Sequence, residues 1–186
     1  MCNFDFSKSL LFANTFSGPP PESTLHWCSE NFGARAYAYS KAVPLICARN
    51  SMVRDALALA DKDTEWIFFT DNDVTITYPS INSFLELEGE LVSCECKCRN
   101  HTAWNDPFAF HCNFWRVRPY VLTAIESPWF ELNISKDGCD LISCECKSLQ
   151  NKALAKEFKV THGGWCSHSQ QGDWLKQGDG KLQQAK

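Results

Sequence analysis

Residues 66–74 read WIFFTDNDV, which joins an apolar run to a cluster of acidic side chains. Trp66–Phe69 is continuously apolar, as is typical of a strand that is buried on both faces. The acidic cluster follows at once, so the sequence predicts a buried strand whose carboxyl end carries carboxylates. Ligands of open α/β sheets bind at such ends, which makes Asp71 and Asp73 the first candidates for a functional site.

The two carboxylates are one residue apart, so in an extended chain both side chains point to the same face. Two carboxylates on one face repel each other unless a cation or a proton lies between them. Oxygen ligands of this kind suit Mg²⁺ or Mn²⁺, and these ions in turn suit diphosphates. The alternative is an ordinary turn, because Asp and Asn are common turn residues.

The composition is that of a globular protein. Of the 186 residues, 44% are hydrophobic and 22% are charged, which predicts one domain with a core of its own. The net charge of -4 gives no reason to expect a nucleic-acid surface. No apolar run approaches the length of a membrane span, and residues 1–16 do not resemble a signal peptide. We therefore expect a cytoplasmic protein, in the host cytoplasm if the chain is viral.

Eleven cysteines are many for this length. Their number is odd and no export signal is recognised, so most are expected to be reduced, small apolar residues. An alternative comes from a near-repeat, LVSCECK at 91–97 and LISCECK at 141–147. If the two Cys-x-Cys pairs faced each other, four thiolates could hold a structural Zn²⁺ in a binding protein. Zinc sites favour about two to four intervening residues, which argues against this alternative.

Strand and helix signals alternate along the chain. Strands are expected at 9–16, 34–40, 65–70, 90–98, 108–117 and 157–161. Helices are expected at 22–32, 45–60, 81–87, 118–125 and 140–154, the third with Ser80 as its N-cap. This alternation predicts an α/β sheet. One domain over 1–168 and a mobile, polar tail over 169–186 are the expected organisation.

The ordered set of motifs resembles the metal-dependent GT-A glycosyltransferases, in the compact form of family-two-like and phage-encoded enzymes. The motifs are ARNSMVRDAL (48–57) with WIFFTDNDV after it, ELVSCECKC (90–98), FAFHCNFWRVRPYVLTAIESPWF (108–130), DGCDLISCECK (137–147) and KVTHGG (159–164). WIFFTDNDV looks like the family's Asp-x-Asp strand. The long segment 108–130 looks like its strand, basic turn, helix and Pro-Trp-Phe segment. The resemblance covers residues 9–168. It implies a single GT-A-like, nucleotide-diphospho-sugar transferase domain, with a mixed, mostly parallel central sheet flanked by helices.

The resemblance implies an enzyme of the hexosyltransferase type, which moves a sugar from a nucleotide-sugar donor to an acceptor hydroxyl. Asp73 would bind a Mn²⁺ or Mg²⁺ ion on the donor diphosphate, and Asp71 would support that ion or hold the ribose or sugar. His162 lies where many members have a further metal ligand. Arg49 and Asn50 would lie near the nucleotide or support the acidic segment.

On the acceptor side, Asp140 lies where inverting members keep the base that takes the hydroxyl proton. Three aromatic residues could form a platform for a sugar ring: Trp104, Trp129 and Phe130. The resemblance does not name the acceptor, so glycan, protein, lipid and modified DNA all remain open.

The sequence also departs from the family pattern, which keeps other interpretations open. Cys139 stands where members have a first acidic residue, and Phe110–Asn113 replaces small residues that usually precede the basic turn. Asp140 could serve only to favour the helix dipole, and His162 could simply end a strand. A non-catalytic nucleotide-sugar or partner-binding module is therefore the alternative function, beside the zinc-stabilised binding protein.

Overall fold

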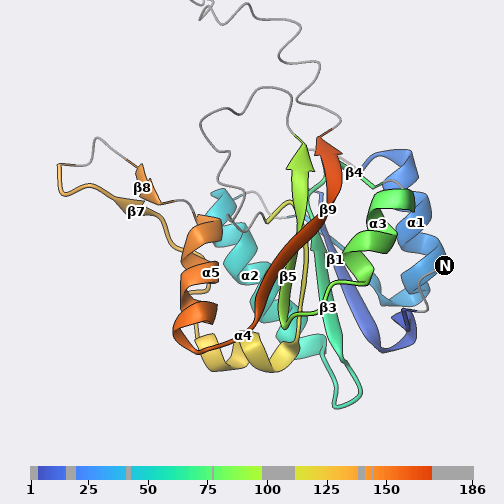
Figure 1. Ribbon diagram of the computed structural model, residues 1–186, viewed down its shortest axis with the longest axis horizontal. Coiled ribbons are helices and arrows are strands. Elements are labelled where there is room, and N and C mark those ends of the chain that lie inside the picture. Colours follow the sequence, from blue (N-terminus) through green and yellow to red (C-terminus); the bar gives the residue numbers. More distant parts are fainter. Residues whose placement is uncertain are drawn as a thin grey trace, which may run out of the picture.

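A mixed β-sheet forms the centre of the computed structural model, which describes residues 4–15, 20–40, 43–76, 78–97, 112–137, 141–143 and 145–168. Within these residues the sheet has seven strands in the order β2-β1-β3-β6-β5-β9-β4 (Figure 1). The strands are β1 (Ser9–Asn14), β2 (Ala36–Tyr39), β3 (Trp66–Thr70), β4 (Val74–Thr75), β5 (Leu91–Lys97), β6 (Phe114–Val117) and β9 (Val160–His168). Neighbours pair in parallel at β1–β2, β1–β3 and β5–β9. β6 is antiparallel to β3 and β5, and β4 is antiparallel to β9, so these two strands run against the other five.

Helices cover both faces of the sheet (Figure 1). They are α1 (Glu22–Phe32), α2 (Leu45–Leu59), α3 (Tyr78–Leu85), α4 (Pro119–Ile125) and α5 (Glu145–Ala155), with short 3-10 helices η1 (Phe6–Lys8) and η2 (Gly33–Arg35). Successive strand residues point to opposite faces, so Leu11 and Phe68 pack under α1 and α3, whereas Leu10 and Phe69 pack under α2, α4 and α5. None of the helices in the described residues is long and apolar enough to cross a membrane.

Local sequence explains where the first helices begin and end. Pro21 and Pro44 each stand immediately before a helix, where their fixed φ angle is compatible with the first turn. α1 ends at Gly33, whose φ of 50° is readily adopted only by glycine. The α/β class with a mixed, mostly parallel sheet between helices is confirmed, and α1 has the predicted bounds.

Several predicted elements are wrong in detail. α3 begins at Tyr78, so Ser80 lies inside the helix and does not cap it. The helix predicted from 140 is instead a short strand, β8 (Leu141–Ser143), followed by α5. β8 forms a separate two-stranded sheet with β7 (Asn133–Ile134), which was not predicted. β9 continues through Gly163 and Gly164 to His168, seven residues beyond the predicted end of this strand at 161.

Some predictions concern residues outside the described part of the chain. These are the predicted platform residue Trp104, the residues Cys139 and Asp140, and the tail over 169–186.

The strand order reverses beside β1. The chain leaves β1 through α1 and enters β2 on one side, then returns through α2 to β3 on the other side. α1 and α2 pack on opposite faces of the sheet. The carboxyl ends of β1 and β3 therefore lie where the strand order reverses, and this is the place where open α/β sheets bind ligands.

Candidate functional site

The acidic segment lies at this reversal point. Asp71 follows β3, and its backbone N–H donates a 2.8 Å hydrogen bond to the carbonyl oxygen of Asn113, just before β6. Asn72 and Asp73 form a turn that leads into β4. Asp71 and Asp73 therefore do not share one face of an extended chain, as was predicted, because the chain turns between them.

Arg49 holds the Asp71 carboxylate from the neighbouring helix α2. Its Nη2 atom lies 2.8 Å from Asp71 Oδ2, and its Nη1 atom lies 2.5 Å from Glu145 Oε1 at the start of α5. The arginine is 4% exposed, and the carboxylate side chains are 14% and 15% exposed. One buried guanidinium thus joins α2, α5 and the end of β3, in the charge-assisted geometry that stabilises carboxylates strongly.

The surroundings keep this guanidinium charged. Burial alone would lower the pKa of Arg49, but Asp71 and then Cys112, Cys146 and Glu145 raise the pKa above its usual value. The Cys146 sulfur is 3.7 Å from Nη1. Two carboxylates thus share one guanidinium, which gives this cluster a formal charge of -1.

Glu145 is the residue of this site that sequence reasoning missed. The acidic residue predicted near the start of this helix is Asp140, which lies outside the described residues. The helix begins at Glu145 because the preceding residues form β8. An acidic residue in the first turn of a helix was the available signal, whereas its pairing with Arg49, 96 residues away, left no trace in the local pattern.

Asn50, predicted to bind the donor, holds the protein backbone instead. Its Oδ1 accepts hydrogen bonds from the backbone N–H groups of Trp129 and Phe130, at 2.9 and 3.0 Å. Its Nδ2 donates to the carbonyl oxygen of Phe130 at 2.9 Å. An amide side chain can make four hydrogen bonds, and three of those of Asn50 are made to residues 129–130.

Trp129 and Phe130, predicted as a sugar platform, are core residues. They are 7% and 1% exposed. The Trp129 Nε1–H donates to the carbonyl oxygen of Leu122, and Phe130 packs edge-on against Trp115 with ring centroids 5.9 Å apart. A sugar ring stacks on an exposed aromatic face, so these two positions do not fit that role. The third predicted platform residue is Trp104, which the structure does not describe.

His162, predicted as a metal ligand, lies on β9, which two strands, β6 and β5, separate from β3. It pairs with Ser93 of β5, and its Nδ1 lies 2.9 Å from Ser93 Oγ. The residue of β9 that lies opposite Val74 is His168, six positions further on. The register through β6 and β5 brings His162 level with Phe69, at three strand spacings or about 14 Å from it, so His162 is separated from the end of β3 across the sheet.

The predicted metal ligands are therefore not assembled as a set. Among the described residues, no three His, Cys, Asp or Glu side chains form a group that could hold a metal ion, so Asp71, Asp73 and His162 do not make a three-ligand site. Mg²⁺ nevertheless takes one or two protein carboxylates and completes its shell with phosphates and water. Asp73, a partly buried residue just after the carboxyl end of β3, has a carboxylate of the kind that such a site uses.

The basic turn lies at the opposite end of the strands, beside the amino end of β3. β6 runs away from the acidic segment, since Phe114 pairs with Thr70 at the end of β3 and Val117 pairs with Ile67 near its start. Arg118, which follows β6, stacks over the Trp66 ring at 4.0 Å. This arginine therefore supports the amino end of β3 and does not face a ligand bound at the carboxyl end.

The zinc alternative loses its geometric basis where the structure describes it. Cys94 is 1% exposed and packs under α1 and α3. Cys146 packs with the cluster under α2, α4 and α5, on the other face of the sheet. These two cysteines, one from each near-repeat, therefore do not converge on a shared ion.

Comparisons with known proteins place the fold but not the activity. No family model matches the chain, and no curated protein matches it. Among solved structures, the chain is similar to the crystal structure of A197 from STIV, with a TM-score of 0.52 and 12% sequence identity. The similarity covers 86% of this chain and 81% of that chain. At this identity the similarity concerns the fold alone.

Proposed function

We propose that this chain is a GT-A-like glycosyltransferase that binds a nucleotide-sugar donor through a divalent ion at Asp73. The observation that carries the proposal is the position of Asp71–Asp73 at the end of β3, where the strand order reverses. A diphosphate bridged to a carboxylate by Mg²⁺ or Mn²⁺ is the ligand chemistry that this edge suits best.

The two carboxylates have different roles in this proposal. Asp71 is held by the Arg49 guanidinium at 2.8 Å, so it positions the segment and is not the principal metal ligand. Asp73 would hold the ion, with the donor phosphates and water as the remaining ligands. A divalent ion there would offset the negative charge that builds on the departing diphosphate.

The first test is a thermal-shift screen of UDP-, GDP-, CMP- and dTDP-sugars, with and without Mn²⁺. A ligand at about 100 times its dissociation constant stabilises the folded state by about 2.7 kcal/mol. For a chain of this size that raises the melting temperature by about 5–10 °C. We expect a shift for one donor base, dependent on Mn²⁺ and absent in Asp73→Asn.

The matched control is Asp63→Asn. Asp63 is an exposed carboxylate in the turn at the other end of β3, where its N–H donates to Asp61 Oδ1. This variant should keep the donor shift. If Asp73→Asn keeps it as well, or if the folded protein shifts with no donor, the proposal is wrong.

Release of free nucleotide separates an enzyme from a binding module. A transferase hydrolyses its donor slowly even without an acceptor, because water can replace the acceptor hydroxyl. Mn²⁺-dependent nucleotide release that Asp73→Asn abolishes would support catalysis. Binding without release, also in the presence of candidate acceptors, would favour the non-catalytic nucleotide-sugar module.

A further inference from the structure

Thr24 of α1 contacts the backbone immediately after the acidic segment. The residue is fully buried, with 0% exposure. Its Oγ1–H donates a 2.6 Å hydrogen bond to the carbonyl oxygen of Val74, and the N–H of Ile76 donates to the same Oγ1 at 3.2 Å. One hydroxyl thus spans both sides of Thr75 and ties the β4 backbone to α1.

The other end of the acidic segment is also fixed. The Asp71 N–H bonds to Asn113, and the Asp71 carboxylate pairs with Arg49. Only Asn72 and Asp73 lie between these contacts and Val74, which is itself 0% exposed. Asn72 is 6% exposed, so the turn is packed as well as anchored. The backbone that carries the Asp73 carboxylate is therefore held from both sides.

Strand pairing alone would hold the backbone that follows Asp73 weakly. β4 has only two residues, Val74 and Thr75, which pair with the last two residues of β9. So short a strand at the edge of a sheet has few ladder hydrogen bonds. The buried Thr24 hydroxyl adds one hydrogen bond at each end of this strand, from an element on a different part of the chain.

We propose that Thr24 is a positioning residue, whose hydroxyl sets the orientation of the Asp73 carboxylate for the divalent ion. This inference rests on the proposed function for the identity of the ion's site. The groups that orient a metal ligand typically change metal affinity by about 10–100-fold when they are removed. Thr24 would act in this way through the backbone of β4, without touching the ion or the donor.

The test measures the dissociation constant of Mn²⁺ by titration calorimetry in the presence of an excess of the nucleotide that the thermal-shift screen identifies, without any assay of activity. We expect Thr24→Val to weaken Mn²⁺ binding by about 10-fold or more. Thr24→Ser keeps the hydroxyl and should keep the wild-type affinity. Amide hydrogen exchange gives a second readout, in which Thr24→Val should accelerate exchange at Ile76 while Phe68 in β3 stays protected.

Thr64→Val is the matched control for loss of a buried threonine hydroxyl. Thr64 is 8% exposed, and its Oγ1 accepts from the N–H of Asp61 and donates to Asp61 Oδ1, at the amino end of β3. Its loss should destabilise the fold by a similar amount and leave Mn²⁺ affinity unchanged. If Thr24→Val lost Mn²⁺ affinity only because its fold is less stable, Thr64→Val would lose affinity to the same extent.

The outcomes separate this inference from the proposed function. If wild-type protein binds Mn²⁺ and Thr24→Val binds it equally well, the role of Thr24 is refuted and the proposed function stands. If Ile76 exchange is unchanged in Thr24→Val, the positioning role is refuted whatever the affinity. If wild-type protein binds no Mn²⁺, with or without nucleotide, the proposed function fails and the role of Thr24 fails with it.

Discussion

At the residue scale, Arg49 is the most heavily engaged side chain of the candidate site. It is buried and shared between Asp71 and Glu145. Arg49→Met would leave two carboxylates close together and partly buried, with no cation between them. Removing one partner of a buried charge network costs about 3–5 kcal/mol. We expect a loss of that size in the free energy of unfolding at pH 7, measured by urea denaturation.

Arg54→Met is the control on the same helix. Arg54 is mostly exposed and pairs only with its exposed neighbour Asp55 among the described contacts. Surface substitutions of this kind change stability by about 0.5 kcal/mol or less. Equal losses in the two variants would contradict the account of Arg49 as the centre of the cluster.

His162 gives a second prediction at this scale. Its Nδ1 lies against Ser93 Oγ in the β5–β9 pair, and three strand spacings, or about 14 Å, separate β9 from β3 and the acidic segment that follows it. His162→Ala should therefore cost about 1–2 kcal/mol of stability through the lost hydrogen bond. It should leave the Mn²⁺-dependent donor shift intact. Loss of that shift at unchanged stability would restore the histidine as a metal ligand.

At the element scale, Asn50 joins the start of α2 to the segment after α4. Its three hydrogen bonds to the backbone of Trp129 and Phe130 are made from one side chain. Asn50→Ala would leave the two N–H groups without this acceptor, at about 1 kcal/mol or more for each lost bond. We expect a decrease of about 2–4 kcal/mol in the free energy of unfolding.

Asn31→Ala is the matched control for Asn50→Ala. Asn31 of α1 makes one side-chain hydrogen bond, to the carbonyl oxygen of Trp27. Its loss should cost about 1 kcal/mol. If Asn50→Ala instead keeps its stability and loses donor binding, Asn50 is a ligand of the nucleotide after all.

The sequence could predict the elements whose own residues determine them. α1 and β3 are such elements, since proline and glycine bracket the first and a continuous apolar run forms the second. β4 and β7 could not be predicted, because each has two residues and exists only through its partner strand. The near-repeat over 91–97 and 141–147 makes the same point. Almost identical residues form β5 in one place and are divided between β8 and α5 in the other.

The candidate site was predictable only in part for a related reason. The position of Asp71 and Asp73 at the end of a buried strand was visible in the sequence and is confirmed. The contacts around them were not visible, because these contacts join residues that are far apart in the sequence. Arg49 and Glu145 are 96 residues apart, and Thr24 and Val74 are 50 apart. Polar side chains such as Asn50 were assigned to ligands, although the backbone of distant segments was what they contacted.

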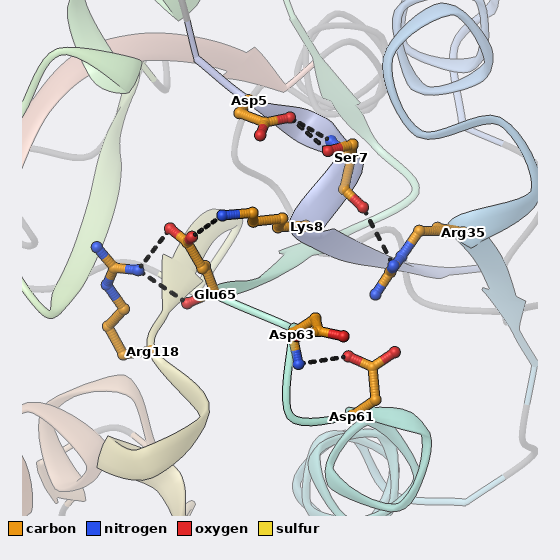
Figure 2. A network of polar contacts seen from close by, with 8 residues as sticks. All are labelled: Asp5, Ser7, Lys8, Arg35, Asp61, Asp63, Glu65 and Arg118. Carbon is orange, nitrogen blue, oxygen red and sulfur yellow. Dashed lines mark hydrogen bonds and ion pairs between the residues drawn. The ribbon is translucent and has the colours of Figure 1, made fainter.

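At the scale of the whole molecule, the two ends of the strands of the central sheet have different polar networks. The carboxyl ends of the parallel strands lie beside the Arg49 cluster, whose guanidinium is buried. Near the amino ends of β1 and β3 lies an exposed network, shown in Figure 2, in which Lys8 and Arg118 both contact Glu65. Arg118 also stacks over Trp66, so this network connects η1, β3 and the segment after β6. We interpret it as a structural network, because its ion pairs connect elements of the fold.

The network should make stability depend on pH through Glu65. The hydrogen bond from Lys8, and then the one from Arg118, lower the pKa of Glu65 below its usual value of 4.5. A carboxyl whose pKa is lower in the folded state stabilises the fold above its unfolded pKa, and that contribution is lost as the pH falls through the folded pKa. Wild-type protein should therefore have a higher urea midpoint than Glu65→Gln at pH 7, and the gap should close by about pH 3. Because the network is exposed, the gap at pH 7 should be small and should narrow further in high salt.

Glu126→Gln, an exposed position after α4 and outside the network of Figure 2, is the control and should show no such gap. A gap between wild type and Glu65→Gln that persisted unchanged to pH 3 would mean that packing, and not charge, is what Glu65 contributes.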